Sequence, residues 1–198
     1  MKLDVAVVDT GVANQASILA ALARIGATTV VVRDPAEILG AARVVLPGVG
    51  AFGPGMETLR RHGLDAALRE RIAGGGALLA ICLGMQLLAE GSDEAPGVAG
   101  IGAIRATVRR LPSGVRVPQL GWNAIIPAAP GLVRDGFAFF ANSYVVDGLD
   151  ASWQASYAEH GTRFVAAAER GGQLACQFHP ELSGEWGQEL LARWCAAC

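Results

Sequence analysis

Residues 79–86 read Leu-Ala-Ile-Cys-Leu-Gly-Met-Gln, and this stretch indicates how the chain folds. The apolar run before Cys82 predicts a buried strand, and the residues after it predict a helix over 83–90. One nucleophile at a sharp strand-to-helix turn is typical of a nucleophile elbow, whose side chain projects above the sheet. Strand and helix pass close together there, so the positions two before and two after must be small, as Ala80 and Gly84 are.

The same turn favours reactivity at Cys82. The helix N-terminus that follows stabilises a thiolate over a thiol. The backbone N–H of Leu83 is expected to point to where an oxyanion would form. Because cysteine also behaves as a small apolar residue, the elbow alone leaves a buried structural cysteine as an equal alternative. A catalytic interpretation needs a base.

His179 is the candidate base. It follows an apolar strand predicted at 174–178, and catalytic groups of open α/β sheets gather at such strand ends. His62 lies near a predicted helix surface and His160 in a polar turn, so both side chains are expected to be solvated rather than catalytic. Glu181 could accept a hydrogen bond from the His179 imidazole and fix its tautomer. The alternative for a histidine at a strand end is packing or capping.

Strand and helix patterns alternate outward from this segment. The first half predicts buried strands separated by helices, and the second half predicts short strands between Gly and Pro turns before a closing helix near Leu190 and Trp194. The strands are expected at 5–8, 28–32, 44–46, 78–81, 104–108, 115–120, 137–142, 145–146, 164–168 and 174–178, and the early helices from Asn14, from the Asp34 cap and through Leu59 to Gly74. This predicts an α/β fold, an open mostly parallel sheet flanked by helices with an added antiparallel strand set.

The composition supports one well-packed unit. The chain has 198 residues, of which 52% are hydrophobic and 17% charged, so we expect a single domain over 1–198. A net charge of −2 without a basic block argues against nucleic acid as a partner. The longest apolar stretch, 77–89, is too short to span a membrane, and the N-terminus lacks signal-peptide features. We therefore expect a cytoplasmic protein.

Cysteine usage fits that compartment. The four cysteines are expected to be free thiols. Cys195 and Cys198 have redox or zinc spacing, but no second ligand pair lies nearby, so a frayed tail is the favoured interpretation. The few dispersed histidines predict no metal site.

At this point the sequence resembles the class I glutamine amidotransferases, whose fold is flavodoxin-like. Residues 79–86 look like their nucleophile motif, and 177–181 (Gln-Phe-His-Pro-Glu) look like their His–x–Glu motif. Within the class the chain is most similar to the glutaminase subunit of imidazole glycerol phosphate synthase, from histidine biosynthesis. Further segments that carry this similarity are 9–14 (DTGVAN), 46–52 (LPGVGAF), 121–123 (GWN) and 142–144 (NSY).

The chain departs from the usual family pattern at four positions. The family usually has Gly at Ala80, Tyr at Thr10, His at Asn142, and often Lys at Leu182. None of these changes removes Cys82, His179 or Glu181.

The resemblance implies a Cys82–His179–Glu181 triad that hydrolyses L-glutamine through a γ-glutamyl thioester. The oxyanion would be held by the Leu83 N–H and by a second N–H, of Val49 or Gly50, from a turn at 47–50 whose two glycines permit a peptide flip. Gln86 and the backbone around Ser143 and Tyr144 would position the glutamine. An exposed helical residue is the alternative for Gln86, and strand packing for Tyr144.

The resemblance also implies a partner. Ammonia would pass to a (β/α)₈-barrel cyclase subunit in a 1:1 heterodimer, with no cofactor. Trp122 would then anchor the interface, although a buried core tryptophan is an equally good interpretation.

Three alternatives remain open. The nearest is a class I glutaminase that feeds another synthase, such as one for pyridoxal phosphate, anthranilate or surface-sugar amidination. A cysteine protease or hydrolase of the same fold would lack the Pro180–Glu181 context. A degenerate scaffold subunit would not need the intact Cys82, His179 and Glu181.

Overall fold

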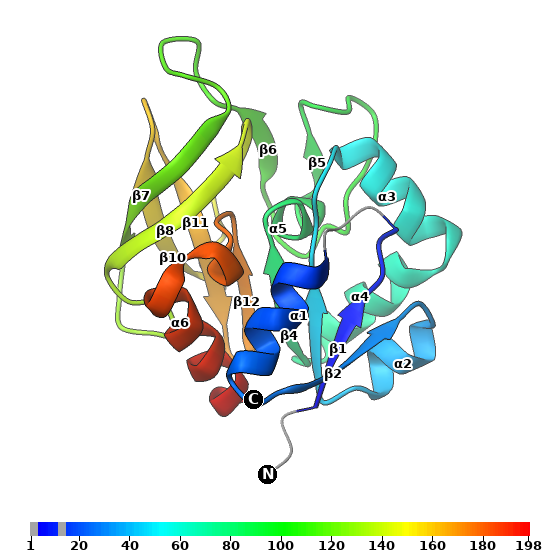
Figure 1. Ribbon diagram of the computed structural model, residues 1–198. Coiled ribbons are helices and arrows are strands. Elements are labelled where there is room, and N and C mark those ends of the chain that lie inside the picture. Colours follow the sequence, from blue (N-terminus) through cyan, green and yellow to red (C-terminus); the bar gives the residue numbers. More distant parts are fainter. Residues whose placement is uncertain (1–3, 12–14) are drawn as a thin grey trace.

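The computed structural model describes residues 4–11 and 15–198. Within them the fold is built on a twelve-stranded mixed sheet, with strands in the order β2-β1-β3-β4-β12-β11-β10-β7-β8 (Figure 1). Off this path, β5 pairs with β6, β6 with β9, and β9 with β11. The strands are β1 (Asp4–Val8), β2 (Thr28–Val32), β3 (Arg43–Leu46), β4 (Ala77–Ile81), β5 (Gly91–Ser92), β6 (Thr107–Arg110), β7 (Gln119–Pro127), β8 (Gly136–Asn142), β9 (Tyr144–Asp147), β10 (Gln154–Glu159), β11 (Arg163–Arg170) and β12 (Gln173–Cys176).

The two halves of the sheet differ as the sequence predicts. Strands β2, β1, β3, β4 and β12 are parallel, whereas β11, β10, β7 and β8 are antiparallel to their neighbours. The α/β class with an added antiparallel set is therefore confirmed. In the parallel half, β3, β4 and β12 end at one edge of the sheet, and Cys82 and His179 both lie just beyond that edge.

Helices cover both faces of the parallel strands because alternate strand residues point to opposite sides. Val5 and Val7 pack into one apolar core with α1 (Gln15–Arg24) and α6 (Gly184–Ala197). Ala6 and Val8 pack into the other, with α2 (Pro35–Gly40), α3 (Phe52–Arg61), α4 (Leu64–Ala73) and α5 (Leu83–Leu87). Figure 1 shows α1 and α6 on the near side, with α2, α3 and α4 grouped at the opposite end of the molecule from β7 and β8.

Several expected boundaries need correction. The single helix predicted through Leu59 to Gly74 is two helices, α3 and α4, because Gly63 between them takes φ +67°. The helix predicted over 83–90 ends at Leu87. The strand expected at 104–108 is β6, shifted toward the C-terminus, and the strand expected at 115–120 begins only at Gln119. The start predicted at Asn14 lies outside the described residues.

The structure also tests the predicted helix cap at Asp34 and the predicted fraying of the C-terminal tail. Asp34 caps α2 as predicted, its carboxylate accepting the Ala36 N–H at 2.8 Å. The tail at Cys195 and Cys198 is docked rather than frayed, because the Arg43 guanidinium donates to both of their backbone carbonyls. None of the helices among the described residues is long and apolar enough to cross a membrane.

Candidate active site

Cys82 takes a backbone conformation that sets it apart. Its φ of 53° and ψ of −111° make it the single non-glycine residue with positive φ in the described part of the chain. Such a conformation costs on the order of 1–3 kcal/mol and persists only where surrounding structure enforces it. The Cys82 N–H donates to the Cys176 carbonyl at 2.7 Å, and its own carbonyl accepts the Gln86 N–H at 3.2 Å. The residue is thereby held between the end of β4 and the start of α5.

Close packing of two glycines sets the position of this turn. An added Cβ on Gly84 would lie 2.2 Å from the Leu46 carbonyl oxygen, and one on Gly48 would lie 2.4 Å from the Gly84 nitrogen. The prediction that the residue two after Cys82 must be small is therefore confirmed. On the strand side, Ala80 is fully buried between β3 and β12, opposite Leu46 and Ala175.

His179 and Glu181 form a buried pair. Nδ1 of His179 donates to Oε1 of Glu181 at 2.8 Å, and about a tenth of each side chain is exposed. The backbone of His179 is anchored as well, since its N–H donates to Phe139 and its carbonyl accepts the Ser183 hydroxyl. Glu181 therefore fixes the orientation of the ring and keeps a proton on the nitrogen that faces it.

The charge on the imidazole follows from its neighbours. Burial lowers the pKa of His179, but hydrogen bonding with Cys82 and Glu181 and their negative charges outweigh burial and raise that pKa to about 10. Next to Cys82, burial raises the pKa of the Cys176 thiol well above its usual range, with smaller contributions from Glu181 and Cys82. The site thus favours an imidazolium at His179 and a neutral, inert thiol at Cys176.

Cys82 opens onto a small pocket of about 150 Å³. Of the residues predicted to act on substrate, Leu83, Gly50, Gln86, Ser143 and Tyr144 line it together with Cys82. His179 and Glu181 are not among its lining residues. The lining is completed by Glu94, Pro118, Ala141 and Asn142.

Only one of the two predicted donors in the 47–50 turn lines the pocket. Gly50 takes φ +100°, which L side chains rarely adopt, and it lines the pocket. The neighbouring Val49 is 36% exposed and is not among the lining residues. Gly48, the other glycine of the turn, is held against Leu83, whose Cβ would lie 2.7 Å from a Cβ added at Gly48.

Several polar groups of the pocket wall already bond to one another. Gln86 is buried rather than exposed, and its Nε2 donates to the carbonyl of Tyr144 at 3.0 Å. The Ser143 carbonyl accepts the Leu111 N–H, so both carbonyls at 143 and 144 are already engaged. Asn142 donates to Tyr144 as well, and its Oδ1 is buried without a partner in the described structure.

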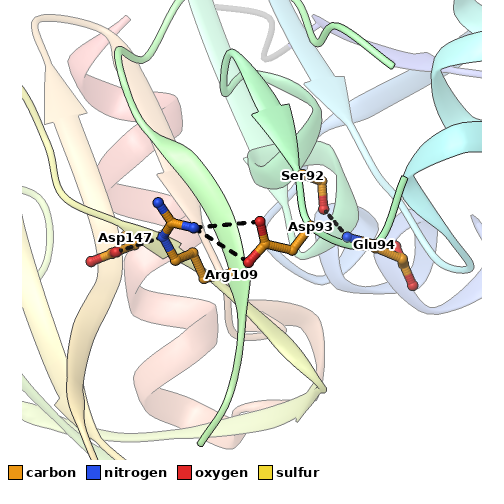
Figure 2. Close-up of polar contacts among 5 residues, drawn as sticks. All are labelled: Ser92, Asp93, Glu94, Arg109 and Asp147. Carbon is orange, nitrogen blue, oxygen red and sulfur yellow. Dashed lines mark hydrogen bonds and ion pairs between the residues drawn. The ribbon is translucent and has the colours of Figure 1, made fainter. Parts of the chain in front are cut away.

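Sequence reasoning missed Glu94, which places a carboxylate at the pocket. Its Oε2 accepts the N–H of Phe52 at 2.8 Å, and its own N–H donates to the Ser92 hydroxyl. Figure 2 shows Arg109 between Asp93 and Asp147, which joins this loop to β6 and β9. An acidic residue in a polar turn carries no local signal of a binding role, so only the fold could reveal it.

Gln177 was also missed as a site residue, although it belongs to the quoted motif. It is fully buried, and its amide lies between Cys82 and Gln86. A glutamine two residues before the candidate base, within the quoted motif, was the available signal.

Comparisons with known proteins identify the relatives of this chain. Residues 6–198 match the family model described as glutamine amidotransferase class-I. The imidazole glycerol phosphate synthase subunit HisH of Symbiobacterium thermophilum is 42% identical over 195 residues, covering 96% of this chain and 92% of that protein. The subunit of the same name from Herpetosiphon aurantiacus is 41% identical over 194 residues, with the same coverage of 96% and 92%. The Arabidopsis thaliana protein named imidazole glycerol phosphate synthase hisHF, chloroplastic, is 38% identical, and the match spans 96% of this chain and 33% of that protein.

Solved structures support the fold. A crystal structure of a glutamine amidotransferase superposes with a TM-score of 0.76 at 24% identity, covering 95% of this chain and 98% of the other. With the family model matched over nearly the whole chain and relatives at 42% and 41% identity, the chain belongs to the class I glutamine amidotransferase family.

Proposed function

We propose that this chain is the glutaminase subunit of an imidazole glycerol phosphate synthase. It would hydrolyse L-glutamine to glutamate and ammonia, with Cys82 as nucleophile, His179 as acid and base, and Glu181 as the group that orients His179. The observation that carries the proposal is the polar pocket at Cys82, backed by the buried His179–Glu181 pair. The similarity to HisH subunits supports the choice of synthase.

The charge state of the resting site suits this chemistry. With its pKa raised to about 10, His179 is protonated at neutral pH. An imidazolium next to Cys82, together with the N-terminus of α5, favours the thiolate, which is the reactive form of cysteine. The enzyme therefore starts with a nucleophile and an acid already paired.

Glutamine would bind through the acceptors of the pocket wall. The Glu94 carboxylate and the unpartnered Oδ1 of Asn142 suit its α-ammonium group. Oε1 of Gln86 is left to accept a further hydrogen bond, because Nε2 is directed at protein acceptors. Since the carbonyls of Ser143 and Tyr144 are engaged, these residues would act through their N–H groups and the Ser143 hydroxyl.

In the first step the Cys82 thiolate attacks the side-chain amide carbon of glutamine, and the carbonyl electron pair moves to oxygen. The Leu83 N–H and an N–H of the 47–50 turn, from Val49 or Gly50, hold this oxyanion. The carbon–nitrogen bond then breaks as His179 gives its proton to the departing nitrogen. Ammonia leaves, and a γ-glutamyl thioester remains on Cys82.

In the second step neutral His179 takes a proton from water, and the hydroxide attacks the thioester. Collapse of the second tetrahedral intermediate breaks the carbon–sulfur bond and releases glutamate. Cys82 returns as a thiolate beside protonated His179. The net reaction consumes one glutamine and one water and yields one glutamate and one ammonia.

A (β/α)₈-barrel cyclase would receive the ammonia in a 1:1 heterodimer. Support for its position comes from an apolar face of the β7–β8 ribbon. Leu120 and Trp122 are 64% and 58% exposed there, and Pro118 and Ala141 beside them line the pocket. Exposed aromatic and aliphatic side chains of this kind anchor protein interfaces. We place the protein in the cytoplasm, where its amino-acid biosynthetic partners would act.

The test is a glutaminase assay on the purified chain, with and without the cyclase and its ribulosyl aminoimidazole carboxamide ligand. Turnover should be low alone and rise strongly in the liganded complex, and Cys82→Ala should abolish it in both. Turnover that ignores the cyclase would favour a glutaminase for another synthase. Full turnover by Cys82→Ala would refute the mechanism.

A further inference from the structure

Gln177 connects the nucleophile to the pocket wall. It follows β12 directly, its side chain is fully buried, and its backbone N–H donates to the Ala166 carbonyl at 2.8 Å. Its Nε2 donates to the Cys82 sulfur at 3.6 Å, and its Oε1 accepts a hydrogen bond from Gln86 Nε2 at 2.9 Å. One amide therefore contacts two residues of the site on its two different atoms.

The direction of these bonds is fixed by what each group can do. A thiolate accepts hydrogen bonds and donates none, so the nitrogen of the Gln177 amide must face Cys82. Its oxygen then faces Gln86 and requires a donor there. Gln86 supplies Nε2, which also donates to the Tyr144 carbonyl at 3.0 Å. The carbonyl oxygen of Gln86 is consequently the part of that amide left for a ligand.

We propose that Gln177 is a positioning residue of the glutaminase reaction. It stabilises the Cys82 thiolate with an N–H hydrogen bond, and it holds the Gln86 amide so that Oε1 can accept from glutamine. The inference rests on the proposed function for its link to glutamine, whereas the contact with Cys82 stands on geometry alone. Two donors, His179 and Gln177, then share the sulfur of Cys82.

The charge on Cys82 sets the orientations of the two glutamine side chains in turn. If Cys82 is an anion, the orientation of Gln177 is set, and through it the orientation of Gln86. A neutral thiol relaxes this requirement because it can also donate. When Cys82 is a thiolate, the pocket wall therefore presents the Gln86 carbonyl oxygen as an acceptor for glutamine.

The main experiment uses Gln177→Met, which keeps the length of the side chain and removes its N–H donor. The rate of Cys82 alkylation by iodoacetamide is measured against pH, with Cys82→Ala as the background for the other cysteines. The titratable groups near Cys82 are His179 and Cys176, with Glu181 bonded to His179 and with Glu94 and Tyr144 lining the pocket, and all are unchanged in the variant. The midpoint should rise by about one pH unit, as expected for losing a hydrogen bond to a charged acceptor.

Glutamine kinetics in the cyclase complex test the second contact. Gln177→Met and Gln86→Met should each raise KM about fivefold or more, and the double variant should lose less than the product of the two. Gln86→Met should leave the alkylation midpoint in place. An unshifted midpoint in Gln177→Met, or multiplicative KM effects, would overturn the proposal.

A matched control is Gln173→Met, since Gln173, at the start of β12, is likewise buried but bonds to the Ile72 carbonyl and to Arg170. It should lose stability without moving the midpoint. If Gln177→Met does not fold, the wild-type chain still decides: the Gln177 side-chain amide proton signals should titrate with the alkylation midpoint, and Cys82→Ala should remove that titration. A wild-type complex that lacks glutaminase turnover would refute the proposed function. The alkylation midpoint and the amide titration would still test the contact between Gln177 and Cys82.

Discussion

Adding one methyl group at Gly84 should separate the nucleophile from its oxyanion turn. In Gly84→Ala the new Cβ would lie 2.2 Å from the backbone oxygen of Leu46, whereas ordinary contact begins at 3.4 Å. The start of α5 must therefore move away from β3 by about 1.2 Å. Strain of this kind in a packed core costs about 1–3 kcal/mol. A displacement of about 1 Å at reacting groups costs on the order of 10²-fold in rate.

The assay compares kcat/KM for glutamine, in the cyclase complex, with urea unfolding of the same samples. Gly53→Ala is the matched control, because its Cβ meets only Ala95 at an ordinary 3.5 Å within a helix. It should keep full activity and gain about 0.5–1 kcal/mol from the lower cost of ordering alanine. A Gly84→Ala enzyme with wild-type kcat/KM and stability would refute the argument that close strand–helix approach positions Cys82.

Two further predictions concern charge and partner binding. Because the pKa of His179 is raised above 6.5 to about 10, its protonation stabilises the fold fully below pH 6.5, and that contribution is lost as pH rises toward 10. Glu181→Gln removes one cause of the shift, so urea unfolding should show the stability gap to wild type shrinking by about 1.5–3 kcal/mol between pH 6 and pH 10; a constant gap would contradict this. Trp122→Ala should weaken cyclase binding, measured by calorimetry, by about 2 kcal/mol, which is roughly 30-fold. The control is Val30→Ala, at an exposed position on the edge strand β2, which should bind the cyclase as wild type does. If Trp122→Ala also bound with wild-type affinity, the β7–β8 face would not be the interface.

The buried strands were the most predictable part of the fold. Strands β1, β3 and β4 fall within a residue of expectation, since strands covered on both faces read as continuous apolar runs. The length of α5 could not be read in this way. The carbonyls of Leu87, Leu88 and Ala89 accept N–H groups from 101–104 instead of continuing the helix. That competition comes from a segment distant in sequence, which local periodicity cannot register.

Some residues of the candidate site could likewise be predicted from the sequence, and others could not. Cys82 and His179 stand out in a sequence because reactive side chains at strand ends are uncommon. Gln177 does not, because glutamine is ordinarily a solvated residue, and Gln86 was predicted only through the family resemblance. Their contact depends on the parallel pairing of Ile81 with Cys176, which brings the residues after β4 and β12 side by side. Only the register of the sheet supplies that information.

The strained backbone at Cys82 sets stability against activity. A glycine at that position would adopt φ 53° without the strain of about 1–3 kcal/mol that a side chain carries there, but it would also lose the packing of a buried side chain and cost more entropy to order. That strain is a substantial part of the roughly 5–15 kcal/mol that separates most folded proteins from their unfolded chains. The fold therefore spends part of its stability on holding Cys82 above the sheet, as sites selected for chemistry rather than stability do.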